Sequence, residues 1–248
     1  MRFYNTNREE ICIDKFIALY GDSYFIGNMR VVKGVTQNSK FVEDEINKIL
    51  VNGIKSTKDI MRILAWKAGK IKHSESQCKE EFVYAKDWDG CEDSLKIRRF
   101  GENIDYTDLA EYIVKDIINL ESRSESDPWK VFSLINEKGH KGIGTVYLIT
   151  LLYFISRGNF PIYDKYAHIA IDAITKINDV KPGEMVPYTA LPGKNFLEEV
   201  KSKYETGYNK KITNVFGDEY TKSRDIDRAL WVYGHLFRTK TEGQFSCS

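Results

Sequence analysis

Apolar residues recur every three or four positions along most of the chain, which is the spacing of a helix with one face packed on a core. One such stretch runs from Ser39 to Leu50. The next follows Ser56, which can cap it in a capping box with Asp59, and ends at Gly69. The same spacing predicts further helices over residues 107–119, 128–139, 145–156, 164–177, from about 195, and 223–237.

Other stretches carry a different pattern. Residues 19–35 are ambiguous between a loop and a short hairpin, and residues 79–99 could begin a strand or form a long charged loop. Three of the five prolines lie within 178–195, where a helix is nearly excluded, so we expect a long surface loop there and a frayed tail over 239–248. The fold class is therefore mainly α. We expect a single unit with successive parts over 1–105, 106–178 and 179–248.

Composition is that of an ordinary globular protein. The 248 residues are 42% hydrophobic, and 37 basic against 36 acidic side chains leave a net charge of +1, so any nucleic-acid site must rest on local charge. The longest uncharged stretch, 142–156, is shorter than the roughly 20 residues of a membrane span. The N-terminus lacks an apolar leader, so we expect a cytoplasmic protein. The cysteines are far apart and form neither a zinc nor an iron–sulfur motif: Cys12, Cys78, Cys91 and Cys247.

A glycine-rich turn stands between two of the predicted helices, at Gly139 to Gly144. Glycines let the backbone turn tightly and approach a partner closely, and the N-terminus of the following helix favours an anion such as a phosphate. Between residues 129 and 168, five basic side chains stand against two acidic ones, a local balance of +3. This pattern favours a clamp on the DNA backbone. The residues expected to contact DNA are Gly139, His140, Lys141, Gly142, Ile143, Gly144 and Thr145.

Asp164 follows at the start of the next helix, twenty residues beyond Gly144, in the element Phe160-Pro161-Ile162-Tyr163-Asp164. A carboxylate at such a place can stabilise positive charge on a sugar and orient or deprotonate water, or it can be only a helix cap. Three segments together resemble the helix-hairpin-helix DNA glycosylase superfamily over about forty residues: the glycine-rich hairpin at Gly139 to Gly144, the apolar helix predicted over 145–156, and the element that contains Asp164. The resemblance implies a helical bundle of two interlocked subdomains that acts on double-stranded DNA, with Asp164 as the catalytic residue.

The chain also departs from the family pattern. His140-Lys141 replaces the usual Leu-Pro of the hairpin, and Val146 stands where bifunctional members carry a nucleophilic lysine. The resemblance therefore implies a monofunctional glycosylase without lyase activity. No iron–sulfur cluster is expected, because Cys247 is alone near the C-terminus, and no cofactor is required. A monovalent cation at the hairpin carbonyls remains an option, held by Lys138, His140 and Ile143.

The target base of such an enzyme leaves the stack and enters a pocket between aromatic or apolar groups. Candidates for the pocket wall are Trp231, Tyr233, Tyr166 and Trp66, although each is individually more typical of core packing. We expect a monomer. Two alternatives remain open: a helix-hairpin-helix protein that binds DNA without chemistry, and a helical protein whose motif is coincidental. Two roles fit the enzyme interpretation: DNA repair, and antiviral defence through excision of a modified base from phage DNA.

Overall fold

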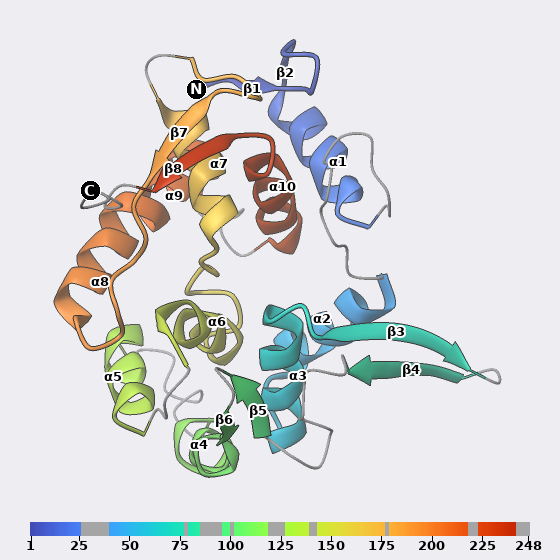
Figure 1. The fold of residues 1–248 in the computed structure, drawn as a ribbon, viewed down its shortest axis with the longest axis vertical. Helices are drawn as coiled ribbons and strands as arrows, with labels where there is room; N and C mark the ends of the chain where they lie inside the picture. The colour runs from blue at the N-terminus through green and yellow to red at the C-terminus, as the bar shows by residue number, and fades with distance from the viewer. Residues whose placement is uncertain are drawn as a thin grey trace. The chain divides into compact units, whose positions relative to one another are not determined.

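The computed structural model describes residues 1–25, 40–76, 79–84, 96–99, 102–118, 127–138, 143–176, 179–217 and 223–241. Within this part of the chain the protein is mainly helical, as the hydrophobic pattern predicts (Figure 1). The chain forms two compact units. Unit 1 comprises residues 1–37, 163–192 and 198–248, and unit 2 comprises residues 38–162 and 193–197. Each unit therefore gathers segments that are distant in the sequence, and the boundary at 162/163 falls inside the expected 106–178 part.

Unit 2 is a group of helices with two antiparallel hairpins. Its helical elements are α2 (Lys40–Asn52), α3 (Thr57–Lys67), α4 (Thr107–Tyr112), the π-helical turn η1 (Ile113–Ile117), α5 (Pro128–Lys138) and α6 (Thr145–Ile155). Its hairpins pair β3 (Ile71–Ser76) with β4 (Lys79–Tyr84), and β5 (Lys96–Arg99) with β6 (Glu102–Asp105).

Helix α6 is the centre of unit 2, and it contacts α2, α3 and α5. Every residue from Leu148 to Ile155 is buried, because the helix is apolar all round rather than on one face. The capping box expected at the start of α3 is confirmed: the Ser56 side chain accepts from the Asp59 amide, and the Asp59 carboxylate accepts from the Ser56 amide.

Unit 1 is built on a helix, α10, that packs against α1 and α7. Its core contains the rings of Phe16, Tyr20 and Tyr233, which lie about 5 Å from one another between centroids. The elements are β1 (Phe3–Tyr4), β2 (Glu10–Ile11), α1 (Ile13–Ser23), α7 (Lys165–Thr175), β7 (Met185–Tyr188), α8 (Leu197–Tyr204), η3 (Glu205–Asn209), α9 (Lys210–Phe216), α10 (Arg224–Gly234) and β8 (Arg238–Thr241).

Gly234 allows α10 and α7 to touch through their backbones. A Cβ added to Gly234 would lie 1.9 Å from the carbonyl oxygen of Tyr166, a distance that no side chain can occupy. The absence of a side chain at this one position of α10 therefore sets how closely the helix approaches the first turn of α7.

Several sequence-based expectations were wrong. Residues 19–23 belong to α1, not to a loop or hairpin, and residues 24–25 follow it, whereas residues 26–35 of that segment lie outside the described part of the chain. The segment expected as a loop over 178–195 is irregular where it is described, except that it contains β7. The tail expected to fray forms β8 as far as Thr241, and its remaining residues lie outside the described part of the chain. These two strands pair in parallel, with Val186 opposite Thr239. The pairing joins segments about fifty residues apart, so a local pattern could not reveal it, and Pro187 is tolerated because a two-stranded sheet has only edge strands.

Candidate functional site

A short segment joins α6 to Asp164. Helix α6 begins after Gly144, its N-cap, and ends at Ile155. Arg157 and Gly158 follow with φ of 51° and 84°, so two successive residues in the left-handed region turn the chain after the helix. The Ser156 hydroxyl then accepts a hydrogen bond from the Phe160 amide at 2.9 Å. The chain continues without regular structure until Asp164 caps α7.

Asp164 is the N-cap residue of α7, with extended backbone angles (φ −140°, ψ 149°). Its Oδ1 accepts a hydrogen bond from the Tyr166 amide at 2.9 Å, and its carbonyl accepts one from the His168 amide at 2.9 Å. The side chain is half-buried. The first turn of a helix is a favourable place for a negative charge, so the carboxylate is held by the helix while it remains accessible to solvent.

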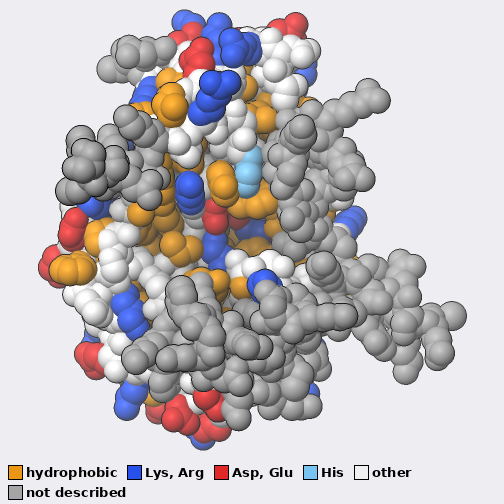
Figure 2. Space-filling model, in the orientation of Figure 1, with side chains coloured by type: hydrophobic (Ala, Val, Ile, Leu, Met, Phe, Trp, Pro, Cys, Tyr) orange, Lys and Arg blue, Asp and Glu red, His pale blue; other side chains and the backbone are white. Residues whose placement is uncertain are grey.

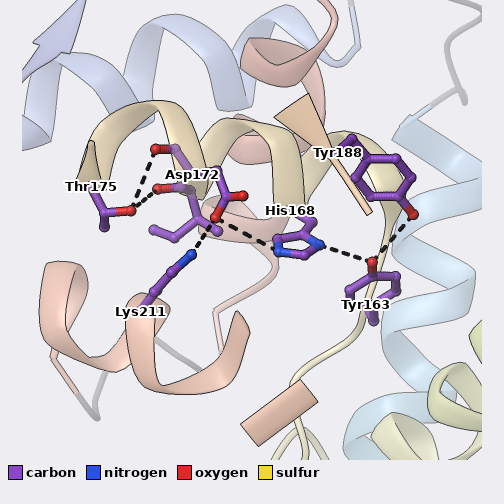
Figure 3. A network of polar contacts seen from close by, with 7 residues as sticks. Tyr163, His168, Asp172, Thr175, Tyr188 and Lys211 are labelled. Carbon is purple, nitrogen blue, oxygen red and sulfur yellow. Dashed lines mark hydrogen bonds and ion pairs between the residues drawn. The ribbon is translucent and has the colours of Figure 1, made fainter. Parts of the chain in front are cut away.

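One side of this first turn is a polar network, which we call the polar side: Tyr163, His168, Asp172, Tyr188 and Lys211 (Figure 3). The hydroxyl of the fully buried Tyr163 lies 2.9 Å from His168 Nδ1 and 3.3 Å from the Tyr188 hydroxyl. His168 Nε2 lies 3.7 Å from Asp172 Oδ1, and the same oxygen accepts from Lys211 Nζ at 2.5 Å. The network thus runs from a buried phenol to a half-buried ion pair.

Burial decides the charge of both rings at the centre of this network. Burial lowers the pKa of His168 below its ordinary value of 6.5, although the nearby Asp172 carboxylate opposes the shift. Burial likewise raises the pKa of Tyr163 far above its ordinary value, so its hydroxyl stays protonated. At neutral pH the pair is therefore a neutral imidazole and a neutral phenol.

The other side of the turn is built from rings, and we call it the aromatic side: Tyr24, Tyr166, Trp231 and His235. Tyr166 and His235 are stacked, with centroids 3.4 Å apart and planes 22° apart. Trp231 meets His235 edge-on at 4.4 Å. All three are only partly buried, and in Figure 2 hydrophobic side chains reach the surface in the region where Figure 1 shows α7 and α10.

His235 is electrostatically linked to Asp164. Burial lowers the pKa of His235, the Asp164 carboxylate raises it, and the Lys165 ammonium lowers it again, so both charges act on this ring. His235 Nδ1 lies 2.8 Å from the Trp231 carbonyl oxygen. Because a carbonyl oxygen only accepts, we assign a proton to Nδ1, which leaves the lone pair on Nε2 of the neutral ring.

Lys165 lies between the two sides. Its Nζ is 5.5 Å from the centre of the Tyr166 ring and 5.6 Å from the centre of the Tyr188 ring. Both distances suit a cation–π contact, so two aromatic faces hold the ammonium group next to the cap residue.

The structure separates the residues that the sequence suggested for a base pocket. Tyr166 and Trp231 both belong to the aromatic side near Asp164. Tyr233 is 1% exposed and lies in the core of unit 1. Trp66 is buried in unit 2, where its Nε1 donates to Glu43 Oε1 at 2.7 Å and its ring packs on Phe154. We therefore leave Tyr233 and Trp66 out of the candidate site, since neither has ring surface to offer a ligand.

Sequence reasoning missed His235, Tyr188 and Lys165 as parts of the site. A signal existed for His235, because it follows Trp231 by four residues and so lies on the same face at the C-terminal end of α10. Tyr188 had no such signal, since it reaches α7 from β7, a strand within the segment predicted to be a loop.

Part of the expected hairpin lies outside the described residues, namely Gly139, His140, Lys141 and Gly142. The remaining positions belong to the start of α6 in unit 2: Ile143 and Thr145 are buried, and Gly144 is exposed with open space around it. Lys138 ends α5, with its Nζ 5.6 Å from the centre of the Tyr112 ring. An exposed helix N-terminus at Gly144 can accept an anion. Of the residues expected to hold a cation at the hairpin carbonyls, His140 lies outside the described residues, whereas Lys138 and Ile143 are described.

In the described part of the chain, no three or more His, Cys, Asp or Glu side chains are grouped to hold a metal ion. The helices described there are also too short or too polar to cross a bilayer. Comparisons with protein families, with curated proteins and with solved structures find no match for this chain. The site itself offers one accessible carboxylate at a helix N-terminus, an ammonium group beside it, and a partly exposed group of aromatic rings. Such a site can stabilise a cationic centre and receive a flat ring.

Proposed function

We propose that the protein is a monofunctional DNA glycosylase that hydrolyses the N-glycosidic bond of a base flipped out of double-stranded DNA and leaves an abasic site. One observation carries the proposal. Asp164 caps α7 twenty residues beyond Gly144, at the end of an apolar helix and a tight turn, and it stands beside partly exposed aromatic rings. This is the order of elements in the helix-hairpin-helix DNA glycosylases that the sequence resembles.

Asp164 would supply the chemistry. When the bond from sugar C1′ to the base nitrogen breaks, its electron pair leaves with the base and C1′ acquires oxocarbenium character. A carboxylate near C1′ stabilises that charge, and it can take a proton from the water that adds to C1′. The Tyr166 amide donates to one oxygen of Asp164 and so orients the carboxylate.

The aromatic side would receive the base. A flipped base is held by stacking on rings and by hydrogen bonds to its edge. Trp231, His235 and Tyr166 supply ring surface, and Nε2 of His235 supplies a hydrogen-bond acceptor. The Lys165 ammonium, held beside Asp164, is a group of opposite charge that can neutralise the electron-rich base as it leaves.

The hairpin segment would hold the DNA backbone. The excess of basic side chains over 129–168 favours phosphate contacts, which fix the position of the duplex but carry no sequence information. The same chemistry serves repair of a damaged base and removal of a modified base from phage DNA. The absence of lyase activity rests on Val146, which stands in the first turn of α6 and has no amine.

The test is incubation of the protein with a panel of duplexes that carry oxidised, alkylated, deaminated or hypermodified bases, followed by alkaline cleavage of abasic sites. We expect one class of base to be excised, with strand breaks only after alkali. Tight duplex binding without excision of any base would favour the non-catalytic alternative. Absence of both binding and excision would show that the motif is coincidental.

A further inference from the structure

Tyr163, the residue before the N-cap of α7, contacts His168, the fourth residue after the N-cap. In many helices the same two positions carry an apolar pair that fixes the angle at which the chain enters the helix. Here a hydrogen bond joins them instead, with 2.9 Å between the Tyr163 hydroxyl and His168 Nδ1 (Figure 3). Asp164 lies between the two residues in the sequence.

The hydrogen bond has a defined direction. His168 Nε2 faces the Asp172 carboxylate, with 3.7 Å between Nε2 and Oδ1. A carboxylate oxygen only accepts, so we assign the ring proton to Nε2, and Nδ1 accepts from the Tyr163 hydroxyl. Lys211 holds Asp172 in turn, with Nζ 2.5 Å from Oδ1.

An apolar pair would be enough to start a helix. Burying a phenol and an imidazole is costly unless each polar atom finds a partner, and here satisfying them involves Asp172 and Lys211 as well. A hydrogen bond fixes distance and angle, whereas an apolar contact fixes only proximity. The network therefore restricts the backbone on both sides of Asp164 more closely than helix formation alone requires.

We propose that Tyr163 and His168 are positioning residues that orient the Asp164 carboxylate through the hydrogen bond between them, an inference that rests on the proposed function of Asp164. Neither residue touches the substrate. Their effect reaches Asp164 through the backbone that joins them, and a displacement of a catalytic group by about 1 Å can cost up to a hundredfold in rate.

Two substitutions of the same residue separate positioning from packing. His168→Leu keeps most of the side-chain volume and removes the acceptor, whereas His168→Asn loses volume and keeps an amide oxygen close to the place of Nδ1. If His168 only fills space, His168→Asn should disturb the Asp164 cap and excision more than His168→Leu does. If His168 positions Asp164, His168→Leu should be the more damaging substitution. Tyr163→Phe removes only the hydroxyl and serves as a second test if His168→Leu does not fold, as judged by thermal melting.

Three readouts are needed, two of which do not depend on activity. Hydrogen exchange of the Tyr166 amide reports the cap, because this amide donates to Asp164 Oδ1. Single-turnover excision with saturating enzyme reports the chemistry, and the dissociation constant for an abasic duplex reports binding.

For His168→Leu we expect amide exchange about tenfold faster, as for loss of one ordinary hydrogen bond, and excision slower by about the same factor. DNA affinity should not change, and His168→Asn should stay within about threefold of wild type. Unchanged exchange in His168→Leu, or a larger effect of Asn than of Leu, would overturn the inference. If the wild-type protein excises no base, the glycosylase proposal fails, whereas the exchange rates still decide whether this pair holds the Asp164 cap.

Discussion

The two sides of the first turn of α7 each contain a histidine, and the two histidines are used differently. Burial lowers the pKa of both. On the polar side, His168 accepts a hydrogen bond through Nδ1 from a buried tyrosine. On the aromatic side, His235 donates through Nδ1 to the Trp231 carbonyl and stacks on Tyr166. The same neutral side chain is thus present as opposite tautomers on the two sides of Asp164.

This difference separates two tasks. The polar side satisfies its buried groups with one another, which suits a device that holds Asp164 and binds nothing. The aromatic side leaves ring surface and one ring nitrogen available, which suits recognition of a flat ligand. Substitutions on the two sides should therefore affect different quantities: rate on the polar side, and base binding on the aromatic side.

The largest effect on the aromatic side should come from Gly234→Ala. A Cβ at this position would lie 1.9 Å from the Tyr166 carbonyl oxygen, so α10 and α7 must separate. We expect a loss of about 3 kcal/mol in the free energy of unfolding, at the upper end of overpacking effects, together with loss of excision. Urea unfolding measures it. Gly21→Ala is the matched control on α1, because its Cβ would lie an ordinary 3.5 Å from the Asp225 carbonyl oxygen. Equal stability of the two variants would contradict the backbone contact.

Trp231→Ala should weaken recognition of the base. Removing a ring on which a base stacks typically costs about 2 kcal/mol, so we expect a rise of more than tenfold in the enzyme concentration needed for half-maximal single-turnover excision. The saturating rate should fall less. Phe196→Ala is the control, because Phe196 is an exposed aromatic residue, at 63%, outside the aromatic side. A Trp231→Ala variant with wild-type concentration dependence would exclude this ring from the base site.

The contrast between the two sides could be predicted only in part from the sequence. The position of Asp164 as a cap followed from one local pattern, as did the apolar helix before it, because hydrophobic spacing and capping residues act over a few positions. The residues that complete the polar and aromatic sides come from β7, α9 and α10, and their approach to α7 depends on tertiary packing such as the contact at Gly234. The parallel pairing of β7 with β8 brings together segments that have no local signal in common.

Stability should fall as the pH drops below about 6.5. Both histidines have a pKa below their ordinary value of 6.5, so the unfolded chain binds protons that the folded chain resists, and acid favours unfolding. In His168→Asn one of these groups is gone, and the free energy of unfolding should depend less steeply on pH between about pH 7 and about pH 5.5. Urea unfolding across this range checks the slope. A slope as steep as that of the wild type would show that His168 is not held neutral.

The last expectation in this order is an absence of effect: the protein itself should not cleave the DNA strand. A lyase needs an amine that attacks C1′ and leaves a reducible imine. Val146 has no amine, and the nearest lysine in sequence to Asp164, Lys165, is engaged with two aromatic rings. Borohydride should therefore trap no protein–DNA adduct during excision, and Lys165→Ala should leave this result unchanged. A strong adduct that disappears on mutation of one lysine would identify a nucleophile and contradict the monofunctional mechanism.

Single-turnover excision by Asp164→Asn tests the central claim most directly. Asparagine caps a helix about as well as aspartate, so the contact to the Tyr166 amide and the fold should persist while the negative charge is lost. Asp127→Asn is the matched control, because Asp127 Oδ1 accepts from the Trp129 amide at 3.0 Å in the same way at the start of α5. We predict a loss of about 3 kcal/mol of transition-state stabilisation, a hundredfold or more in rate, for Asp164→Asn alone, with unchanged affinity for an abasic duplex. Excision at the wild-type rate by Asp164→Asn would contradict the catalytic role of this carboxylate.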